Sequence, residues 1–211
     1  MTSIIAFDLD GTLIDSKEDI ADAVNEYRAT HGLPLLPLPQ VVSYTGNGPV
    51  KLLERSVPEL LKAGVTMEEM LRDEGECYHR RLVNKTRLYP GVAETIPRLA
   101  ENYRLAVVSN KQDSFSRIIL DKLGILPYIT SVVGSGRIQE KKPEPQPMWL
   151  AMKECGAVAD GSWFVGDHWT DLGVAKASGV KACFCAYGMG NMGGRRADAV
   201  IWEFSQLLTI L

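Results

Sequence analysis

The chain begins with a run of apolar residues that ends in two carboxylates. Ile4–Phe7 is apolar, Asp8 and Asp10 follow one residue apart, and Gly11 and Thr12 come next. A run of about four to eight apolar residues bounded by turn residues predicts a buried strand, and Gly11 allows a sharp turn at its end. Carboxylates there are costly unless a cation or a reaction uses them. Such residues also cap helices, so this stretch alone leaves a structural interpretation open.

The next segment shows only helical spacing, with apolar residues recurring every third or fourth position. This spacing covers Ser16–His31, Val50–Val57 and Met67–Arg81, and Gln40–Tyr44 is either helical or extended. Glycine and proline separate these stretches. No strand-like alternation occurs between Ser16 and Leu88, so we predict an all-helical unit over residues 16–87.

After Tyr89-Pro90-Gly91 the pattern changes to strands alternating with helices. Strands are predicted at Leu105–Val108, Ser131–Val133, Trp163–Val165, Lys181–Tyr187 and Ala199–Ile201. Helices are predicted at Val92–Asn102, Ser114–Leu123, Pro145–Cys155, Leu172–Ser178 and the C-terminus. This alternation indicates an α/β fold with a doubly wound parallel sheet. We predict an α/β core over residues 1–15 and 88–211, with the helical unit inserted as a movable cover.

The composition agrees with a soluble globular protein. The 211 residues are 45% hydrophobic and 23% charged, with a formal net charge of -3, which disfavours a nucleic-acid partner. No apolar run approaches the roughly 20 residues that cross a bilayer, and the N-terminal run does not resemble a signal peptide. We therefore expect a cytosolic protein with reduced cysteines. Cys183 and Cys185 fit a buried strand better than a metal site.

Four polar stretches follow the predicted strands. They are Asp8–Thr12, Ser109-Asn110, Lys141–Pro145 and Gly166–Asp171. Each has a structural interpretation as a turn, a helix cap, a solvated loop or one face of a helix. Parallel sheets, however, bind ligands where the carboxyl ends of their strands meet. Together the stretches offer acids, a hydroxyl, an amide and a cation, which suit a divalent metal and a phosphoryl group.

The acids of this set match the ligands that Mg²⁺ prefers. Mg²⁺ takes hard oxygen ligands and keeps waters and a substrate phosphate. Asp8, Asp167 and the backbone carbonyl of Asp10 can supply protein oxygens, and Asp171 can hold a metal-bound water. We therefore expect Mg²⁺ as the cofactor.

The remaining groups suit phosphoryl transfer. A carboxylate beside Mg²⁺ can attack phosphorus, and a second acid, here Asp10, can protonate the leaving alcohol and later activate water. Thr12, Ser109 and Asn110 are candidates for binding phosphate oxygens. Lys142 can balance the charge of phosphate and nucleophile, and its neighbouring prolines predict an extended backbone.

These residues resemble the motifs of the haloacid dehalogenase superfamily. The matching stretches are Asp8–Leu13, Ser109–Lys111, Lys142–Pro145 and Gly166–Asp171, in this order along nearly the whole chain. The resemblance implies a Rossmann-like core with a helical cap, Mg²⁺ dependence and phosphate-ester hydrolysis through Asp8. It also implies that Asp10 is the acid and base, that Ser109 and Lys142 contact the phosphate, and that Asp167 binds the metal.

A closer resemblance is to phosphoglycolate phosphatases. It is carried by Asp15–Asn25 and by Tyr44–Arg55, which look like the first cap helix and the Gly-Asn-Gly cap loop with its following helix. In that family the cap largely selects the substrate, so Gly46, Asn47 and Lys51 are candidate substrate-binding residues. Lys51 or Arg55 would suit a substrate carboxylate, and a solvated role is also open. His168-Trp169 departs from the smaller, more polar residues associated with that position.

Other functions keep most of these motifs. Pyrophosphatases, sugar-phosphate or nucleotide phosphatases and phosphomutases of the same capped type would retain all of them. Asp10 argues against a dehalogenase, and the helical insertion argues against a phospho-accepting signalling domain. The expected partner is a small phosphorylated metabolite, and the expected assembly is a monomer or homodimer.

Overall fold

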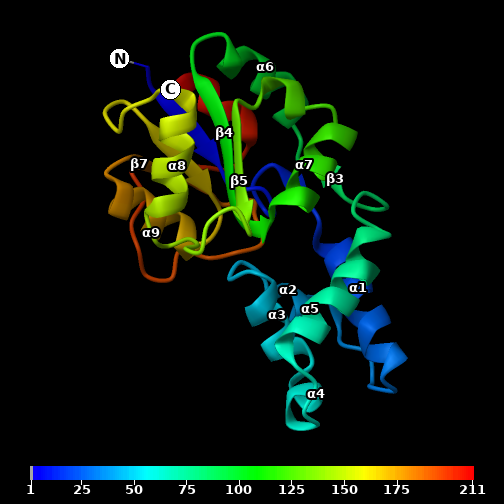
Figure 1. Cartoon of the computed structure of the whole chain (residues 1–211). Helices are drawn as coiled ribbons and strands as arrows, with labels where there is room; N and C mark the ends of the chain where they lie inside the picture. The colour runs from blue at the N-terminus through cyan, green and yellow to red at the C-terminus, as the bar shows by residue number, and fades with distance from the viewer. Residues whose placement is uncertain (1) are drawn as a thin grey trace. The chain divides into compact units, whose positions relative to one another are not determined.

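The computed structural model describes residues 2–211, which form two compact units. One unit contains the residues up to Asp15 together with Arg87–Leu211, and the other contains Ser16–Thr86. Figure 1 shows the elements of each unit along the chain. The two units are described separately below.

The first unit is built on a parallel sheet. Within residues 2–211 the sheet has six strands in the order β5-β4-β1-β6-β7-β8. Their bounds are β1 Ile4–Phe7, β4 Arg104–Gln112, β5 Ser131–Ser135, β6 Trp163–Gly166, β7 Lys181–Cys185 and β8 Ala199–Ile201. Each neighbouring pair is parallel. The predicted α/β fold with a doubly wound parallel sheet is therefore confirmed.

The register of the central strand determines where the polar stretches begin. Phe7 at the end of β1 lies opposite Val107 of β4 and Val165 of β6. The backbone N–H of Asp8 donates to the carbonyl of Val165 at 2.9 Å, so pairing continues one residue beyond the strand. As a result, three segments that are far apart in the sequence reach the same edge of the sheet together.

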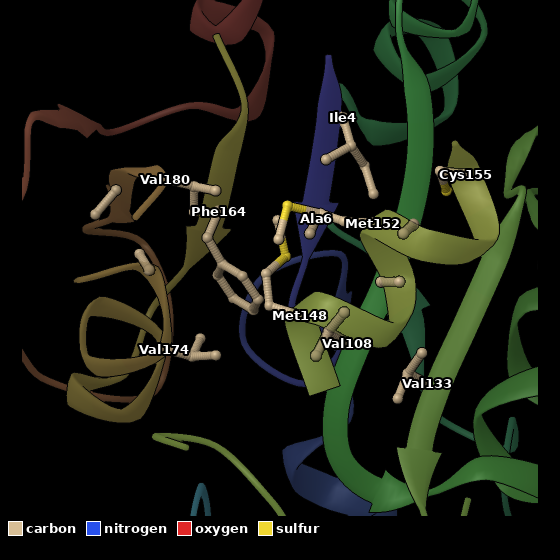
Figure 2. Packing of buried hydrophobic residues seen from close by; sticks show 14 of the residues in the cluster. Ile4, Ala6, Val108, Val133, Met148, Met152, Cys155, Phe164, Val174 and Val180 are labelled. Carbon is tan, nitrogen blue, oxygen red and sulfur yellow. The ribbon is translucent and has the colours of Figure 1, made fainter. Parts of the chain in front are cut away.

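Helices cover the sheet on its two faces. Their bounds are α6 Val92–Ala100, α7 Asp113–Lys122, α8 Gln146–Cys155, α9 Trp169–Ser178 and α10 Leu207–Ile210, with short 3₁₀ turns η1 Leu126–Tyr128 and η2 Phe204–Gln206. On one face, α8 and α9 pack against β1, β4 and β6 through buried apolar side chains, among them Ile4 and Ala6. Figure 2 shows Met148 and Met152 of α8 lying near Ala6 and Phe164. On the other face, Phe7 contacts Phe204 at 5.7 Å between ring centroids. Burial on both faces explains why the strands read as continuous apolar runs.

The second unit is helical. Its elements are α1 Lys17–Thr30, α2 Leu38–Val42, α3 Pro49–Ser56, α4 Pro58–Lys62 and α5 Met67–His79. α1 packs against α5 through buried residues that include Val24, Tyr27 and Met70. Thr66 and Glu69 form a reciprocal capping box that starts α5.

Four elements differ from the sequence-based predictions. α4 was not predicted, because a five-residue helix that begins at Pro58 is too short to show a period. Two-residue strands β2 Ile14–Asp15 and β3 Arg87–Leu88 pair antiparallel in the first unit and were not predicted, and Arg87 lies inside the stretch from Ser16 to Leu88 in which no strand was expected. β4 extends through the polar residues 109–112, where a register shift interrupts its pairing with β5. In the described residues, no helix has the length and apolar character needed to span a membrane.

Candidate active site

Three buried aspartates gather where the strands of the parallel sheet end. Asp8 follows β1, Asp167 follows β6, and Asp171 lies in the first turn of α9. Each offers one carboxylate oxygen, and these three atoms lie within 4.8 Å of one another. All three residues are at most 7% exposed. Clustered carboxylates in such a buried site repel one another unless cations lie close to them.

The ammonium of Lys142 supplies one such cation. Its Nζ lies 2.8 Å from Oδ1 of Asp8 and 2.7 Å from Oδ1 of Asp171. The backbone N–H of Leu9 also donates to Oδ1 of Asp8 at 2.7 Å. The Leu9 N–H and the Lys142 ammonium therefore contact the same oxygen, and within the described residues Oδ2 of Asp8 accepts no hydrogen bond from the protein. That oxygen is left for a ligand.

The position of Lys142 depends on a neighbouring amide. Asn110 accepts a hydrogen bond from the Lys142 backbone N–H at 2.9 Å and donates one to the Lys142 carbonyl at 3.1 Å. Lys142 lies in a turn that closes where the N–H of Glu144 donates to the carbonyl of Lys141 at 2.9 Å, and the predicted extended backbone at Lys142 stays a prediction. The ammonium also lies 5.2 Å from the ring centroid of Phe164, a cation–π contact. Lys142 is therefore fixed at both its backbone and its side chain.

Asp167 is surrounded by donors and glycines. Its Oδ2 accepts from the backbone N–H groups of Met189 and Gly190, both at 2.8 Å, and its Oδ1 accepts from the Thr12 hydroxyl at 3.1 Å. A Cβ atom added at Gly11 would lie 2.2 Å from Oδ2, and one at Gly188 would lie 2.2 Å from the Asp167 Cβ. Only glycine fits this closely, and the φ of +85° at Gly11 also favours glycine.

Asp171 has two roles in this arrangement. Its Oδ1 contacts Lys142, while its Oδ2 accepts from the backbone N–H of His168 at 2.8 Å. The second contact caps α9, because His168 is the residue that precedes the helix. The start of α9 is thus tied directly to the acidic cluster.

The pKa values reflect the concentration of negative charge. Burial raises the pKa of Asp167, and the carboxylates of Asp171 and Asp8 raise it further. Burial also raises the pKa of Asp171, although Lys142 opposes this. For Lys142, burial alone would lower the pKa, but Asp171 and Asp8 outweigh burial and raise it. A divalent cation would relieve this repulsion, and an all-oxygen donor set in a rigid, glycine-lined cradle suits Mg²⁺.

Asp10 is engaged separately. Lys111 Nζ lies 2.9 Å from both Asp10 carboxylate oxygens, and the Lys111 side chain is 8% exposed. The backbone N–H of Lys111 donates to the Ser109 hydroxyl oxygen at 3.3 Å. The second acid of the opening stretch therefore has a lysine partner of its own.

Comparisons with known proteins identify the family of this chain. A model of the haloacid dehalogenase-like hydrolase family matches residues 5–185. The phosphoglycolate phosphatase of Pseudomonas syringae pv. syringae B728a is 36% identical over 194 residues, which are 89% of this chain and 71% of that protein. The chain belongs to the haloacid dehalogenase-like hydrolases. The phosphoglycolate phosphatase of Photorhabdus laumondii subsp. laumondii is 33% identical over 217 residues, with 98% of this chain and 91% of that protein covered.

A solved structure extends the likeness to the whole hydrolase. The crystal structure of a predicted phosphoglycolate phosphatase from Haemophilus somnus 129PT has a TM-score of 0.91 and 31% identity, covering 99% of this chain and 97% of that one. The predictions of the haloacid dehalogenase superfamily and of a phosphatase enzyme are therefore confirmed.

Two predicted phosphate-binding side chains of the hydrolase already have protein partners. The Thr12 hydroxyl donates to Asp167, and the Asn110 amide pairs with the backbone of Lys142. Both side chains help to position the charged groups, and their predicted contact with phosphate stays a prediction. The Ser109 hydroxyl is buried. Its predicted contact with phosphate also stays a prediction.

The predicted cap residues of the hydrolase lie in the helical unit. Asn47 accepts a hydrogen bond from Arg55 at 3.0 Å, and Arg55 also donates to the Tyr44 carbonyl at 3.1 Å, so Arg55 holds the Gly46–Gly48 loop. The Lys51 ammonium lies 2.5 Å from Glu54. Substrate binding by Gly46, Asn47 and Lys51 stays a prediction.

The sequence analysis missed several residues of the site. Met189 and Gly190 belong to a glycine-rich segment whose only signal was its composition. Tyr187 donates to the Thr12 carbonyl at 2.9 Å, and its ring lies 4.8 Å from that of Tyr89. Burial raises the pKa of Tyr187, so its hydroxyl stays protonated as a donor.

His168 and Trp169 have structural roles at the start of α9. His168 caps the helix, and Trp169 packs on Arg195, with its ring centroid 5.3 Å from the guanidinium carbon.

Proposed function

We propose that this hydrolase is a Mg²⁺-dependent phosphomonoesterase that acts through an aspartyl-phosphate intermediate, with 2-phosphoglycolate as its substrate. The observation that carries the proposal is the Asp8 carboxylate, held on one oxygen by Lys142 and placed within 4.8 Å of ligand oxygens from Asp167 and Asp171. This arrangement provides a fixed, buried nucleophile beside a cation.

In the first step, Oδ2 of Asp8 attacks phosphorus. A bond forms between this oxygen and phosphorus as the bond from phosphorus to the alcohol oxygen breaks, and that oxygen keeps the electron pair. Asp10 donates a proton to it, which releases the neutral alcohol group. Lys142 remains beside the carboxylate and offsets the negative charge of the phosphoryl group.

In the second step, water hydrolyses the aspartyl phosphate. Asp10, now ionised, takes a proton from the attacking water as the new oxygen–phosphorus bond forms. The bond between phosphorus and Asp8 breaks, and its electron pair returns to the carboxylate. Inorganic phosphate leaves, and both aspartates are restored to their starting states.

The metal would be held by carboxylate oxygens of Asp8 and Asp167 and by the backbone carbonyl of Asp10, with Asp171 reaching it through water. When bound, Mg²⁺ supplies positive charge next to the phosphoryl oxygens and the nucleophile. The fit rests on the all-oxygen donor set of three buried aspartates whose ligand atoms lie within 4.8 Å of one another.

The substrate assignment is supported by the relatives. Both curated relatives described above are named phosphoglycolate phosphatases. We propose that the helical unit acts as a cap and that Gly46, Asn47 and Lys51 take part in substrate selection. The cytosolic location and the monomeric or homodimeric assembly stay predictions.

A hydrolysis screen tests the proposal. The purified protein is assayed with and without Mg²⁺ on phosphoglycolate, sugar phosphates, nucleotides and pyrophosphate. We expect Mg²⁺-dependent release of phosphate that is most efficient from phosphoglycolate. A preference for pyrophosphate or another ester would replace the proposed substrate, and conversion of one phosphate ester into an isomer would indicate a mutase.

A substitution of the nucleophile tests the intermediate. Asp8→Asn should lower kcat by more than about 10³-fold, because an amide cannot replace the carboxylate. Asp160→Asn, an exposed aspartate of the same unit, serves as the control and should keep full activity. Normal turnover in Asp8→Asn would remove Asp8 from this role.

A further inference from the structure

The pair of Lys111 and Asp10 brings a second ammonium to the carboxylates of the site. Lys111 follows Ser109 and Asn110 on β4, and its Nζ reaches both Asp10 oxygens at 2.9 Å. The Lys111 side chain is 8% exposed and that of Asp10 is 19% exposed, so the pair lies largely out of water. Coulomb interactions strengthen as the surrounding dielectric falls. The Lys111 ammonium would therefore interact strongly with any charged group that binds beside Asp10.

We propose that Lys111 is a specificity-determining residue that binds the carboxylate of the substrate while remaining in contact with Asp10. The inference rests on the proposed function, since it requires Asp10 to face the ester oxygen of a carboxylated phosphate ester. It assigns the carboxylate contact to the α/β core, in addition to any contact from the helical unit.

Reach is the first argument. In phosphoglycolate a single methylene carbon separates the ester oxygen from the carboxylate, so by ordinary bond lengths the carboxylate oxygens lie about 3 Å from that oxygen. Asp10 must approach the same ester oxygen within hydrogen-bond distance, about 2.7 Å, to protonate it. A cation 2.9 Å from Asp10 is then within reach of the substrate carboxylate. An ammonium carries three donors and can contact both carboxylates together.

Charge is the second argument. The carboxylates of Asp8, Asp167 and Asp171 lie at the site and would repel a substrate carboxylate placed beside Asp10. Lys142 is already bound to Asp8 and Asp171. Lys111 is the ammonium bound to Asp10 itself, so it can offset the repulsion at the place where the substrate carboxylate would lie.

Binding of two matched phosphonates tests the inference without turnover. 3-Phosphonopropionate has the shape of phosphoglycolate with a methylene group in place of the ester oxygen, and propylphosphonate has a methyl group in place of its carboxylate. Titration calorimetry in Mg²⁺ should show that wild type prefers 3-phosphonopropionate. Lys111→Met should weaken that ligand by about 10- to 100-fold, the worth of a charged hydrogen bond, and change propylphosphonate by less than about threefold. Lys111→Arg should restore part of the preference.

Lys122→Met is the matched control, because Lys122 is an exposed lysine at the end of α7 in the same unit. It should leave both affinities unchanged. Equal losses for both phosphonates in Lys111→Met would overturn the inference, since they would indicate a general disturbance of the site. Equal affinities in wild type would overturn it as well.

The outcomes also separate this inference from the proposed substrate. If wild type hydrolyses phosphoglycolate but binds the two phosphonates equally, the carboxylate role of Lys111 is wrong and the proposed function stands. If Lys111→Met loses a clear preference for 3-phosphonopropionate while wild type does not hydrolyse phosphoglycolate, the carboxylate contact stands and the proposed substrate is wrong.

Discussion

The side-chain amide of Asn110 pairs with both backbone polar groups of Lys142. The amide oxygen accepts the Lys142 N–H at 2.9 Å, and the amide nitrogen donates to the Lys142 carbonyl at 3.1 Å. The ammonium of the same lysine joins Asp8 to Asp171. One buried amide on β4 therefore sets the position of the charge that holds the proposed nucleophile.

Asn110→Ala should consequently impair both stability and turnover. It leaves two buried backbone groups without their partner, which costs about 1–3 kcal/mol of the free energy of unfolding. We expect kcat to fall by at least about tenfold, since Lys142 loses its fixed place next to Asp8. Chemical denaturation and steady-state kinetics measure the two effects. The exposed Asn102→Ala is the control, and an Asn110→Ala protein with wild-type kcat would contradict this role.

Gly11 and Gly124 provide a matched pair for the metal site. Both have positive φ, +85° and +75°, but an added Cβ would meet Asp167 only at Gly11, and at Gly124 it meets nothing within 4 Å. Alanine at either position should cost about 1 kcal/mol through backbone strain. Only Gly11→Ala should also raise the Mg²⁺ concentration for half-maximal activity, by about tenfold or more. The added methyl group would displace the Asp167 carboxylate, and disturbing the orientation of a metal ligand costs metal affinity on this scale. Equal Mg²⁺ titrations in the two variants would show that Asp167 is not a metal ligand.

The raised pKa values of Asp167 and Asp171 predict a pH-dependent stability for the metal-free protein. Their folded pKa values exceed the ordinary aspartate value of about 3.9, so the folded state binds more protons than the unfolded state above that pH. The stabilising contribution is therefore complete below about pH 4 and is lost as pH rises through the folded pKa values. In a chelator, these two groups should make the melting temperature fall between about pH 5 and about pH 8.

Mg²⁺ and a variant serve as controls for this trend. Bound Mg²⁺ favours the ionised carboxylates and should flatten the decline. Asp167→Asn should flatten it in the chelator alone, whereas Asp160→Asn should follow wild type. A chelated wild-type protein whose melting temperature rises over this pH range, with no effect of Asp167→Asn, would contradict the assignment.

Tyr187→Phe tests whether the Tyr187 hydroxyl helps to position Thr12. The Tyr187 hydroxyl donates to the Thr12 carbonyl, and the Thr12 hydroxyl donates to Asp167. Loss of the hydroxyl should lower the free energy of unfolding by about 1 kcal/mol and lower kcat/KM several-fold. The control substitution Tyr128→Phe should have smaller effects on both. Tyr128 is 40% exposed, so its hydroxyl contributes less. Unchanged kinetics in Tyr187→Phe would show that Thr12 holds its place without this bond.

Local patterns were sufficient to predict most of the core. The apolar runs around Ile5, Val107 and Val165 identify the central strands because such strands are buried on both faces. The polar residues that end them predict where the site forms, since parallel strands meet at their carboxyl ends. Asp8, Asp167 and Asp171 could therefore be placed together without coordinates.

Other features depend on contacts that no local pattern contains. The hydrogen bonds of the Asn110 amide to the backbone of Lys142, 32 residues away, could not be predicted from the sequence around either residue. Lys111 follows a recognisable pair of residues, yet only the fold brings it to Asp10, 101 residues away. The prolines beside Lys142 predict a restrained backbone, but the hydrogen bond from Glu144 to Lys141 that closes a turn there could not be predicted from them.

The place of β1 at the centre of the sheet has a consequence for biosynthesis. The strand that carries Asp8 is among the first parts of the chain to be made, but its partners Val107 and Val165 are made much later. Long-range parallel pairing of this kind is slow. A ribosome-bound chain thus exposes β1 until β6 emerges, and the nucleophile gains its surroundings only when the sheet closes around it. We expect catalytic competence to appear late in folding, after the helices have formed.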